Sequence, residues 1–211
     1  MILYEKYRPR CFDDFIGQDK IIKQVKSILG RPDFDREAFW IQGPSGTGKT
    51  SLAWIIARQL VKDDFDIIEY NGDKINKGAM AEIERNIRFF PMFGGWKVYL
   101  IDEAHSMNWH VIQSLLTLLE NLPPKRLFIF TTTESVEADL FGNFTDPFRS
   151  RCQVFTFSAQ GLAQKFAEKA REIACKEGLN GKPEHAYYRL VQRCHNNMRM
   201  VIREISKGEM I

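Results

Sequence analysis

The sequence predicts an α/β protein with a five-stranded parallel sheet between helices, followed by three further helices. Short apolar segments alternate with longer amphipathic segments through the first 157 residues, and this alternation is typical of the crossover units that build a parallel sheet. One turn between them carries the pattern G-x-x-x-x-G-K-[ST]. After residue 157 only helical periodicity remains. We therefore expect an α/β core over residues 1–157 and a small three-helix lid over residues 158–211.

Five segments have the composition of buried strands. Several are apolar at consecutive positions, as parallel strands covered on both faces are. The segments are Ala38–Ile41, Ile67–Tyr70, Val98–Ile101, Leu127–Phe130 and Val154–Phe157. We expect all of them in one sheet.

Helical periodicity fills the intervals between the strands. Apolar residues recur on one helical face in residues 21–29, 51–60 and 111–119. Gly30 and Pro32 end the first of these helices, and consecutive prolines end the third. Residues 158–178, 186–194 and 199–205 show the same periodicity and form the expected lid.

Composition excludes several classes of protein. With 211 residues, 44% of them hydrophobic, the chain can bury a core and is not disordered. No apolar run reaches the length of a membrane span, and the N-terminus lacks the pattern of a signal peptide. The four cysteines have neither zinc-ligand spacing nor the pattern of a disulfide framework. We expect a cytoplasmic protein with reduced thiols and no membrane partner.

Charge does not identify a partner. The formal net charge is +3, and residues 158–211 hold 10 basic and 6 acidic side chains. A solvated helical surface explains this surplus as well as a nucleic-acid contact does.

The glycine-rich turn has the composition of a phosphate-binding loop. It follows a predicted strand and opens a predicted helix, which is the context that this motif requires. Its backbone N–H groups and the helix N-terminus suit phosphate oxygens. Lys49 would neutralise phosphate charge, and the Thr50 hydroxyl would bind Mg²⁺. The expected nucleotide-binding residues are Gly43, Pro44, Ser45, Gly46, Thr47, Gly48, Lys49, Thr50 and Ser51.

Two acidic residues follow the third predicted strand. In this position Asp102 would lie beside Mg²⁺, and Glu103 would act as the general base toward the attacking water. The pair favours hydrolysis over phosphoryl transfer to a hydroxyl. His105 follows closely, and we leave open whether it contacts the nucleotide site or makes a hydrogen bond at the start of a helix.

These motifs occur in the order found in a known family. Tyr7-Arg8-Pro9, Ile16-Gly17, the phosphate loop, Asp-Glu-Ala-His, Thr131-Thr132-Thr133 and Ser150-Arg151-Cys152 follow one another along nearly the whole chain. The set resembles the AAA+ ATPase subunits of sliding-clamp loaders, namely the replication factor C small subunits and the bacterial DNA polymerase III gamma/tau subunit. The Ser-Arg-Cys triplet together with Tyr-Arg-Pro is the most specific element.

The resemblance implies roles for further residues. Tyr7, Arg8, Pro9, Ile16 and Gly17 match the segment that lines the adenine pocket. Thr133 matches sensor 1, and Arg151 matches the arginine finger that reaches the ATP of a neighbouring subunit. A salt-bridged surface arginine is the alternative for Arg151.

A second arginine is implied in the lid. Asn196-Asn197-Met198-Arg199 resembles the family's Gly-Asp-Met-Arg stretch, which makes Arg199 the sensor 2 candidate. Asn196 stands where the family has glycine. Asparagine tolerates left-handed backbone, so the match is retained.

The resemblance also implies the cofactors and partners. These are ATP, Mg²⁺, a primed double-stranded/single-stranded DNA junction, a sliding clamp and other loader subunits in a homo- or hetero-oligomeric ring. A bacterial or phage-infected cell is the expected setting.

Two segments of the family pattern are missing. No cysteine lies in residues 61–97, so the zinc module typical of gamma/tau is absent. The chain also stops after the lid, without the helical collar that holds the family's ring together. We expect either a truncated chain or a short form of phage origin.

Two surface segments each have two possible interpretations. The resemblance places Lys74, Lys77 and Arg85 toward DNA, although an ordinary surface turn is favoured from the sequence alone. Residues 89–96 form an unusually aromatic loop. We expect them to pack beneath the edge of the sheet, and the alternative is a contact with a partner or the clamp.

Two other functions compete with a clamp-loading ATPase. One is a structural stator subunit that supplies Arg151 without turning over ATP, although such subunits tend to have a damaged phosphate loop. The other is a different AAA+ motor, such as a Holliday-junction helicase, which rarely combines Ser-Arg-Cys with Tyr-Arg-Pro.

Overall fold

The computed structural model describes residues 2–92, 94–133 and 145–211. Its sheet has five parallel strands in the order β2-β3-β4-β1-β5. The strands are β1 (Arg36–Gln42), β2 (Ile67–Asn71), β3 (Lys97–Asp102), β4 (Arg126–Thr132) and β5 (Gln153–Thr156). Each contains most of one segment that the sequence predicts, so the predicted five-stranded parallel sheet is confirmed.

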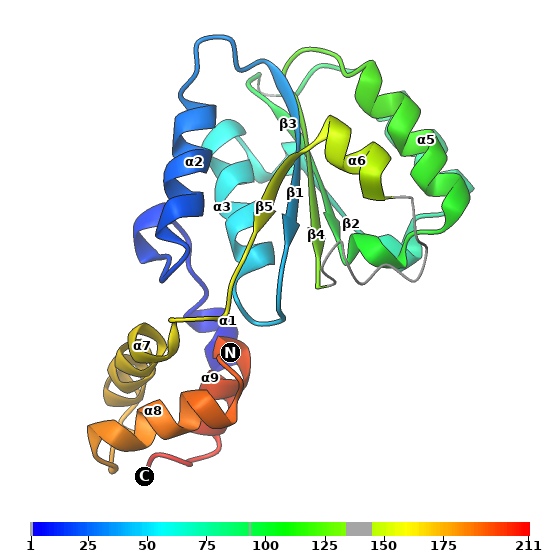
Figure 1. Cartoon of the computed structure of the whole chain (residues 1–211). Coiled ribbons are helices and arrows are strands. Elements are labelled where there is room, and N and C mark those ends of the chain that lie inside the picture. The colour runs from blue at the N-terminus through cyan, green and yellow to red at the C-terminus, as the bar shows by residue number, and fades with distance from the viewer. Residues whose placement is uncertain (1, 93, 134–144) are drawn as a thin grey trace.

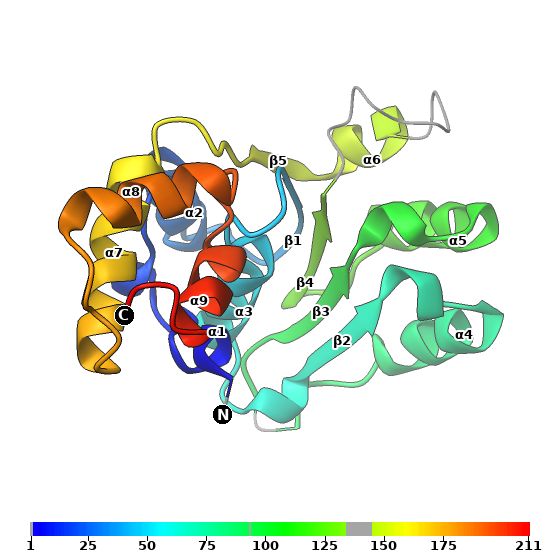
Figure 2. The ribbon, with the colours of Figure 1, turned by 90° about the horizontal axis from the view of Figure 1, so that it is seen from below.

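Helices cover both faces of the sheet (Figures 1 and 2). One face carries α2 (Asp19–Leu29) and α3 (Lys49–Leu60), and the other carries α4 (Lys77–Asn86), α5 (Trp109–Glu120) and α6 (Thr145–Arg151). Each side has its own apolar core, because side chains of successive strand residues alternate between the faces. The strands are accordingly buried on both sides, which explains their continuous apolar runs.

The remaining helices form the lid. They are α7 (Ala163–Lys176), α8 (Glu184–Arg193) and α9 (Met198–Ser206), and they share a third apolar core. Val191, Val201 and Ile205 in this core are fully buried. The three predicted lid helices are therefore present, while the domain boundary after residue 157 stays a prediction.

A short N-terminal helix connects the lid to the rest of the molecule. Helix α1 (Leu3–Lys6) lies against α9, between the lid and the sheet (Figures 1 and 2). The side chains of Lys6 and Tyr7 both donate to the carboxylate of Glu177, just beyond the end of α7. The N-terminal segment thus contacts both α9 and the end of α7.

The aromatic loop differs from its prediction. Phe89, Phe90 and Met92 are 61%, 89% and 78% exposed, so the expectation that they pack beneath the sheet edge was wrong. Trp96 packs as expected, because its ring stacks on Phe34 at 4.5 Å between centroids, and Pro91 is buried. Phe93 lies outside the described residues.

Two buried cations explain why these aromatic residues are exposed. The Arg126 side chain, 2% exposed, donates to the carbonyl oxygens of Ile87 and Phe89. The Lys97 ammonium donates to the carbonyl oxygens of Asn86 and Phe89 at 3.2 Å. These bonds satisfy the free carbonyls after α4 and occupy the space beneath the loop. The aromatic rings are therefore left on the outside.

Within the described ranges, no helix has the length and apolar content needed to cross a bilayer.

Candidate nucleotide site

The phosphate loop lies between β1 and α3, as its motif predicts. Gly46 and Gly48 have φ values of 74° and 101°, in the left-handed region that glycine adopts without strain. A Cβ atom on Gly48 would also collide with the Phe15 ring, and one on Gly46 with the side chain of Asn197. The loop thus needs glycine for both its backbone conformation and its close packing.

Lys49 is the first residue of α3 and is 6% exposed. Its ammonium donates to the carbonyl oxygens of Gly43 and Pro44 at 2.8 and 2.9 Å, across the inside of the loop. Burial lowers the pKa of Lys49, and the charges of Glu103 and Asp102 oppose that shift. A buried cation inside a loop of this shape is matched to an anionic ligand.

Thr50 and Asp102 meet at the edge of the sheet. Thr50 Oγ1 donates to Asp102 Oδ1 at 3.1 Å, and the Thr131 hydroxyl donates to the same carboxylate oxygen. Hydroxyl and carboxylate oxygens are ligands that Mg²⁺ prefers. The residues present therefore fit the metal that the sequence suggests, with Thr131 holding the carboxylate in place.

Glu103 has an unusual backbone conformation. Its φ and ψ are 51° and 48°, a left-handed conformation that is uncommon outside glycine and asparagine. Its carboxylate is 3.3 Å from Thr133 Oγ1 and 3.4 Å from His105 Nδ1. His105 Nδ1 also lies 3.1 Å from Thr132 Oγ1, so this ring contacts the acidic pair and the end of β4.

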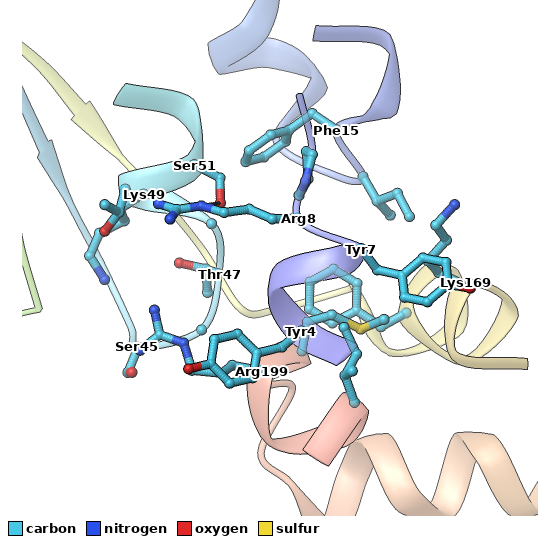
Figure 3. Close-up of a pocket in the computed structure, with 18 of the residues that line it drawn as sticks. Tyr4, Tyr7, Arg8, Phe15, Ser45, Thr47, Lys49, Ser51, Lys169 and Arg199 are labelled. Carbon is cyan, nitrogen blue, oxygen red and sulfur yellow. Dashed lines mark hydrogen bonds between the residues drawn. The ribbon is translucent and has the colours of Figure 1, made fainter. Parts of the chain in front are cut away.

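A single cavity combines the phosphate loop with the lid (Figure 3). Glu103 and Thr133 line it from the sheet edge, and Met198, Arg199 and Ile202 line it from α9. The backbone N–H of Met198 donates to the Gly46 carbonyl oxygen at 3.3 Å. The lid thus touches the phosphate loop directly.

Asn196 has the left-handed conformation expected where the family has glycine. Its φ is 56°, and its side-chain amide donates to the carbonyl oxygen of Ala159 at 2.9 Å. Asn197 then caps α9 by accepting from the N–H of Met200. Arg199, in the first turn, has its guanidinium 5.9 Å from the Tyr4 ring centroid, a cation–π contact.

The segment expected to line an adenine pocket surrounds this cavity. Tyr7, Arg8, Pro9 and Ile16 line it, together with Tyr4, Phe15 and three lid residues that sequence reasoning missed, Phe166, Lys169 and Ile173. Gly17 is not among the lining residues and packs against Leu162 instead. The position of the apolar lid residues in the cavity depends on the packing of α7 beside residues 15–16. This contact joins distant parts of the sequence, so the local pattern does not predict it.

Arg151 lies away from this cavity. It ends α6, and its guanidinium binds Glu120 at the end of α5 and the Pro147 carbonyl oxygen. The structure therefore does not bring Arg151 together with Lys49 and Glu103 of the same chain. Lys74, Lys77 and Arg85 do not line the cavity either, and all three are exposed.

Comparison with known proteins finds similarity to subunits of DNA polymerase III and of replication factor C. Residues 59–161 match the family described as DNA polymerase III, delta subunit. The chain is 32% identical over 205 residues to the replication factor C small subunit of Haloarcula marismortui, which covers 94% of this chain and 59% of the relative. It is also 32% identical over 178 residues to the DNA polymerase III subunit tau of Bacillus subtilis, covering 74% of this chain and 30% of that subunit.

The chain is a homologue of these DNA replication subunits. This homologue spans less than two thirds of each relative's length. Among solved structures, the RuvB Holliday junction branch migration motor of Thermotoga maritima is similar in fold. Its TM-score is 0.72, its identity 23%, and the match covers 95% of this chain and 64% of RuvB. The two chains thus share a fold.

Proposed function

We propose that this chain is the ATP-binding and ATP-hydrolysing subunit of a DNA sliding-clamp loader. The observation that carries the proposal is the meeting of a complete phosphate loop with Thr50, Asp102, Glu103 and Thr133 in a homologue of replication factor C and gamma/tau. ATP binding and hydrolysis would then drive placement of a clamp on primed DNA, in the cytoplasm of a bacterial or phage-infected cell.

Roles follow from the positions of the site residues. Lys49 would bind the β- and γ-phosphates, and Thr50 and Asp102 would hold Mg²⁺, which neutralises phosphate charge when bound. Glu103 would take the proton of the attacking water, with Thr133 orienting the same carboxylate. The Arg199 guanidinium would move from the Tyr4 ring to bind the phosphates of the nucleotide.

Arg151 is proposed to act on a neighbouring subunit. Its remoteness from the cavity of its own chain and its 30% side-chain exposure support supply in trans. A guanidinium is suited to the charge that develops on a transferring phosphoryl group. The isolated chain should therefore bind ATP and hydrolyse it slowly.

The surface offers separate areas for DNA and for the clamp. Lys74, Lys77 and Arg85 are exposed around α4 and would contact the DNA backbone. Phe89 and Phe90 project at the far end of α4 on backbone held by Arg126 and Lys97. Exposed aromatic residues on a fixed turn suit insertion into an apolar cleft of a protein partner, which we assign to the clamp.

The proposed function can be tested by measuring ATPase activity in the assembled complex. We expect primed DNA and the clamp each to raise the ATPase rate. In the double variant Phe89→Ala/Phe90→Ala, stimulation by the clamp should be lost and stimulation by DNA should remain. Tyr188→Ala, an exposed aromatic residue on the lid, serves as the matched control. Stimulation by a Holliday junction without any clamp effect would indicate a different motor, and absence of turnover with all partners would indicate a stator.

A further inference from the structure

Arg8 lies on the phosphate side of the cavity. Its Nε donates to Ser51 Oγ at 3.1 Å. Ser51 follows Thr50 in the first turn of α3, whose N-terminus forms the floor of the phosphate loop. In Figure 3 the Arg8 side chain extends toward Lys49 and Ser51, away from Tyr7 and Lys169 at the opposite end of the cavity.

The terminal nitrogens of Arg8 remain available for a ligand. Within residues 2–92, 94–133 and 145–211, the one side-chain hydrogen bond of Arg8 uses Nε, and no carboxylate in these ranges lies within ion-pair distance of its guanidinium. Loss of hydration lowers the pKa of Arg8; the Glu69 carboxylate opposes that shift, and the like charge of Arg199 adds to it. A partly desolvated cation that has a second cation nearby is stabilised by an anion.

We propose that Arg8 binds the phosphate chain of the nucleotide in cis, as a third cation beside Lys49 and Arg199. Its two Nη groups would donate to phosphate oxygens while Nε stays on Ser51, a geometry that the fork of a guanidinium allows. The proposal rests on the proposed function, because it assumes that the cavity binds ATP. It assigns Arg8 to the phosphates instead of the base.

This position also connects the phosphates with the lid. Arg8 comes directly after Tyr7, whose hydroxyl donates to Glu177 at the end of α7. Four residues before Arg8, the Tyr4 ring lies against Arg199 of α9. A phosphate held by Arg8 would therefore fix the N-terminal segment on which two lid contacts depend.

Binding of a nucleotide without its base tests the proposal. Affinities of Mg-ATP and of magnesium tripolyphosphate are measured by calorimetry for the full chain, Arg8→Ala, Arg8→Lys and Arg10→Ala. Arg10 is exposed, is not part of the cavity lining and serves as the matched control. We expect Arg8→Ala to weaken both ligands by the same factor, about 10- to 100-fold, because it removes charge-assisted hydrogen bonds. The affinities of Arg8→Lys for both ligands should lie between those of the wild type and Arg8→Ala. Arg10→Ala should change neither affinity by more than about twofold.

Two results would overturn the proposal. If Arg8→Ala binds ATP more weakly but binds tripolyphosphate as tightly as the wild type does, Arg8 contacts the base or ribose. If it binds both ligands as tightly as the wild type does, Arg8 has no part in nucleotide binding. Lys49→Ala separates these results from failure of the proposed function: if the wild type and Lys49→Ala bind ATP equally poorly, the cavity is not a nucleotide site. Unchanged melting temperatures show that the variants are folded.

Discussion

Arg151 and Glu120 form an ion pair between the last residues of α6 and α5. The guanidinium donates to Glu120 through Nε and Nη2 and to the Pro147 carbonyl oxygen through Nη1 at 2.9 Å. Glu120 is 52% exposed, so water screens the pair, and such pairs contribute only about 0–1 kcal/mol. The phosphate group that we propose as its partner in trans can therefore compete with Glu120 for Arg151.

Mixing two inactive variants should restore activity if Arg151 acts in trans. Lys49→Ala retains the arginine finger Arg151 but does not bind nucleotide. Arg151→Ala binds nucleotide but lacks the arginine finger. We expect Arg151→Ala alone to lower turnover in the assembled ring by about 10³-fold or more, with ATP binding intact. The mixture should recover part of the wild-type rate in a steady-state ATPase assay. Failure to recover, together with full activity of Arg151→Ala in the ring, would exclude the finger role.

Glu103 and Lys49 should differ in which step their loss affects. Glu103→Gln keeps the size of the side chain and removes its basicity, so turnover should fall by about 10²-fold or more while ATP still binds. Lys49→Ala should abolish detectable binding, because it removes the buried cation of the phosphate loop. Equilibrium binding and single-turnover hydrolysis distinguish the two. Equal loss of binding in both variants would mean that Glu103 is not the base.

Arg126 should matter for stability although it is far from the nucleotide site. Its buried guanidinium satisfies carbonyl oxygens on residues 87, 89 and 124. Arg126→Ala leaves these groups unpaired around a cavity, so the free energy of unfolding should fall by about 3–5 kcal/mol. Arg85→Ala, at an exposed position on α4, should change it by less than about 0.5 kcal/mol. Urea denaturation measures both, and equal midpoints would contradict the role of Arg126.

Thiol labelling should separate the cysteines by burial. Burial raises the pKa of Cys152 to about 12, so this thiol stays protonated and unreactive at pH 8 and remains so as the pH rises to 9. Cys194 is buried, and burial raises its pKa as well. In a Cys11→Ser background, Cys175 should react first with iodoacetamide, because it is exposed. Mass spectrometry of the native protein would contradict this if Cys152 were modified as quickly.

The sequence was sufficient for features that depend on local pattern. All five strands could be predicted because parallel strands buried on both faces have continuous apolar runs. The phosphate loop and acidic pair were recognisable because each depends on a short segment with fixed spacing. The left-handed conformation of Asn196 was expected from its residue type.

Features that depend on strand register were not predictable. Thr131 reaches Asp102 because Ile101 pairs with Phe130, which aligns the ends of β3 and β4. Arg126 begins a strand, where a charged residue is ordinarily solvated, and only the tertiary structure shows that it is buried. The exposure of Phe89 and Phe90 follows from that burial, and the composition of the loop gave the opposite expectation.

Strands β3 and β4 each have a buried cation at the start and a site residue at the end. Lys97 and Arg126 bind the backbone of the aromatic loop, while Asp102 and Thr131, each five residues further along its strand, lie beside the phosphate loop. At about 3.3 Å per residue the two ends are about 17 Å apart, and a buried strand does not stretch. The two strands therefore form a stiff connection between the phosphate loop and the aromatic loop, so we expect their two ends to move together.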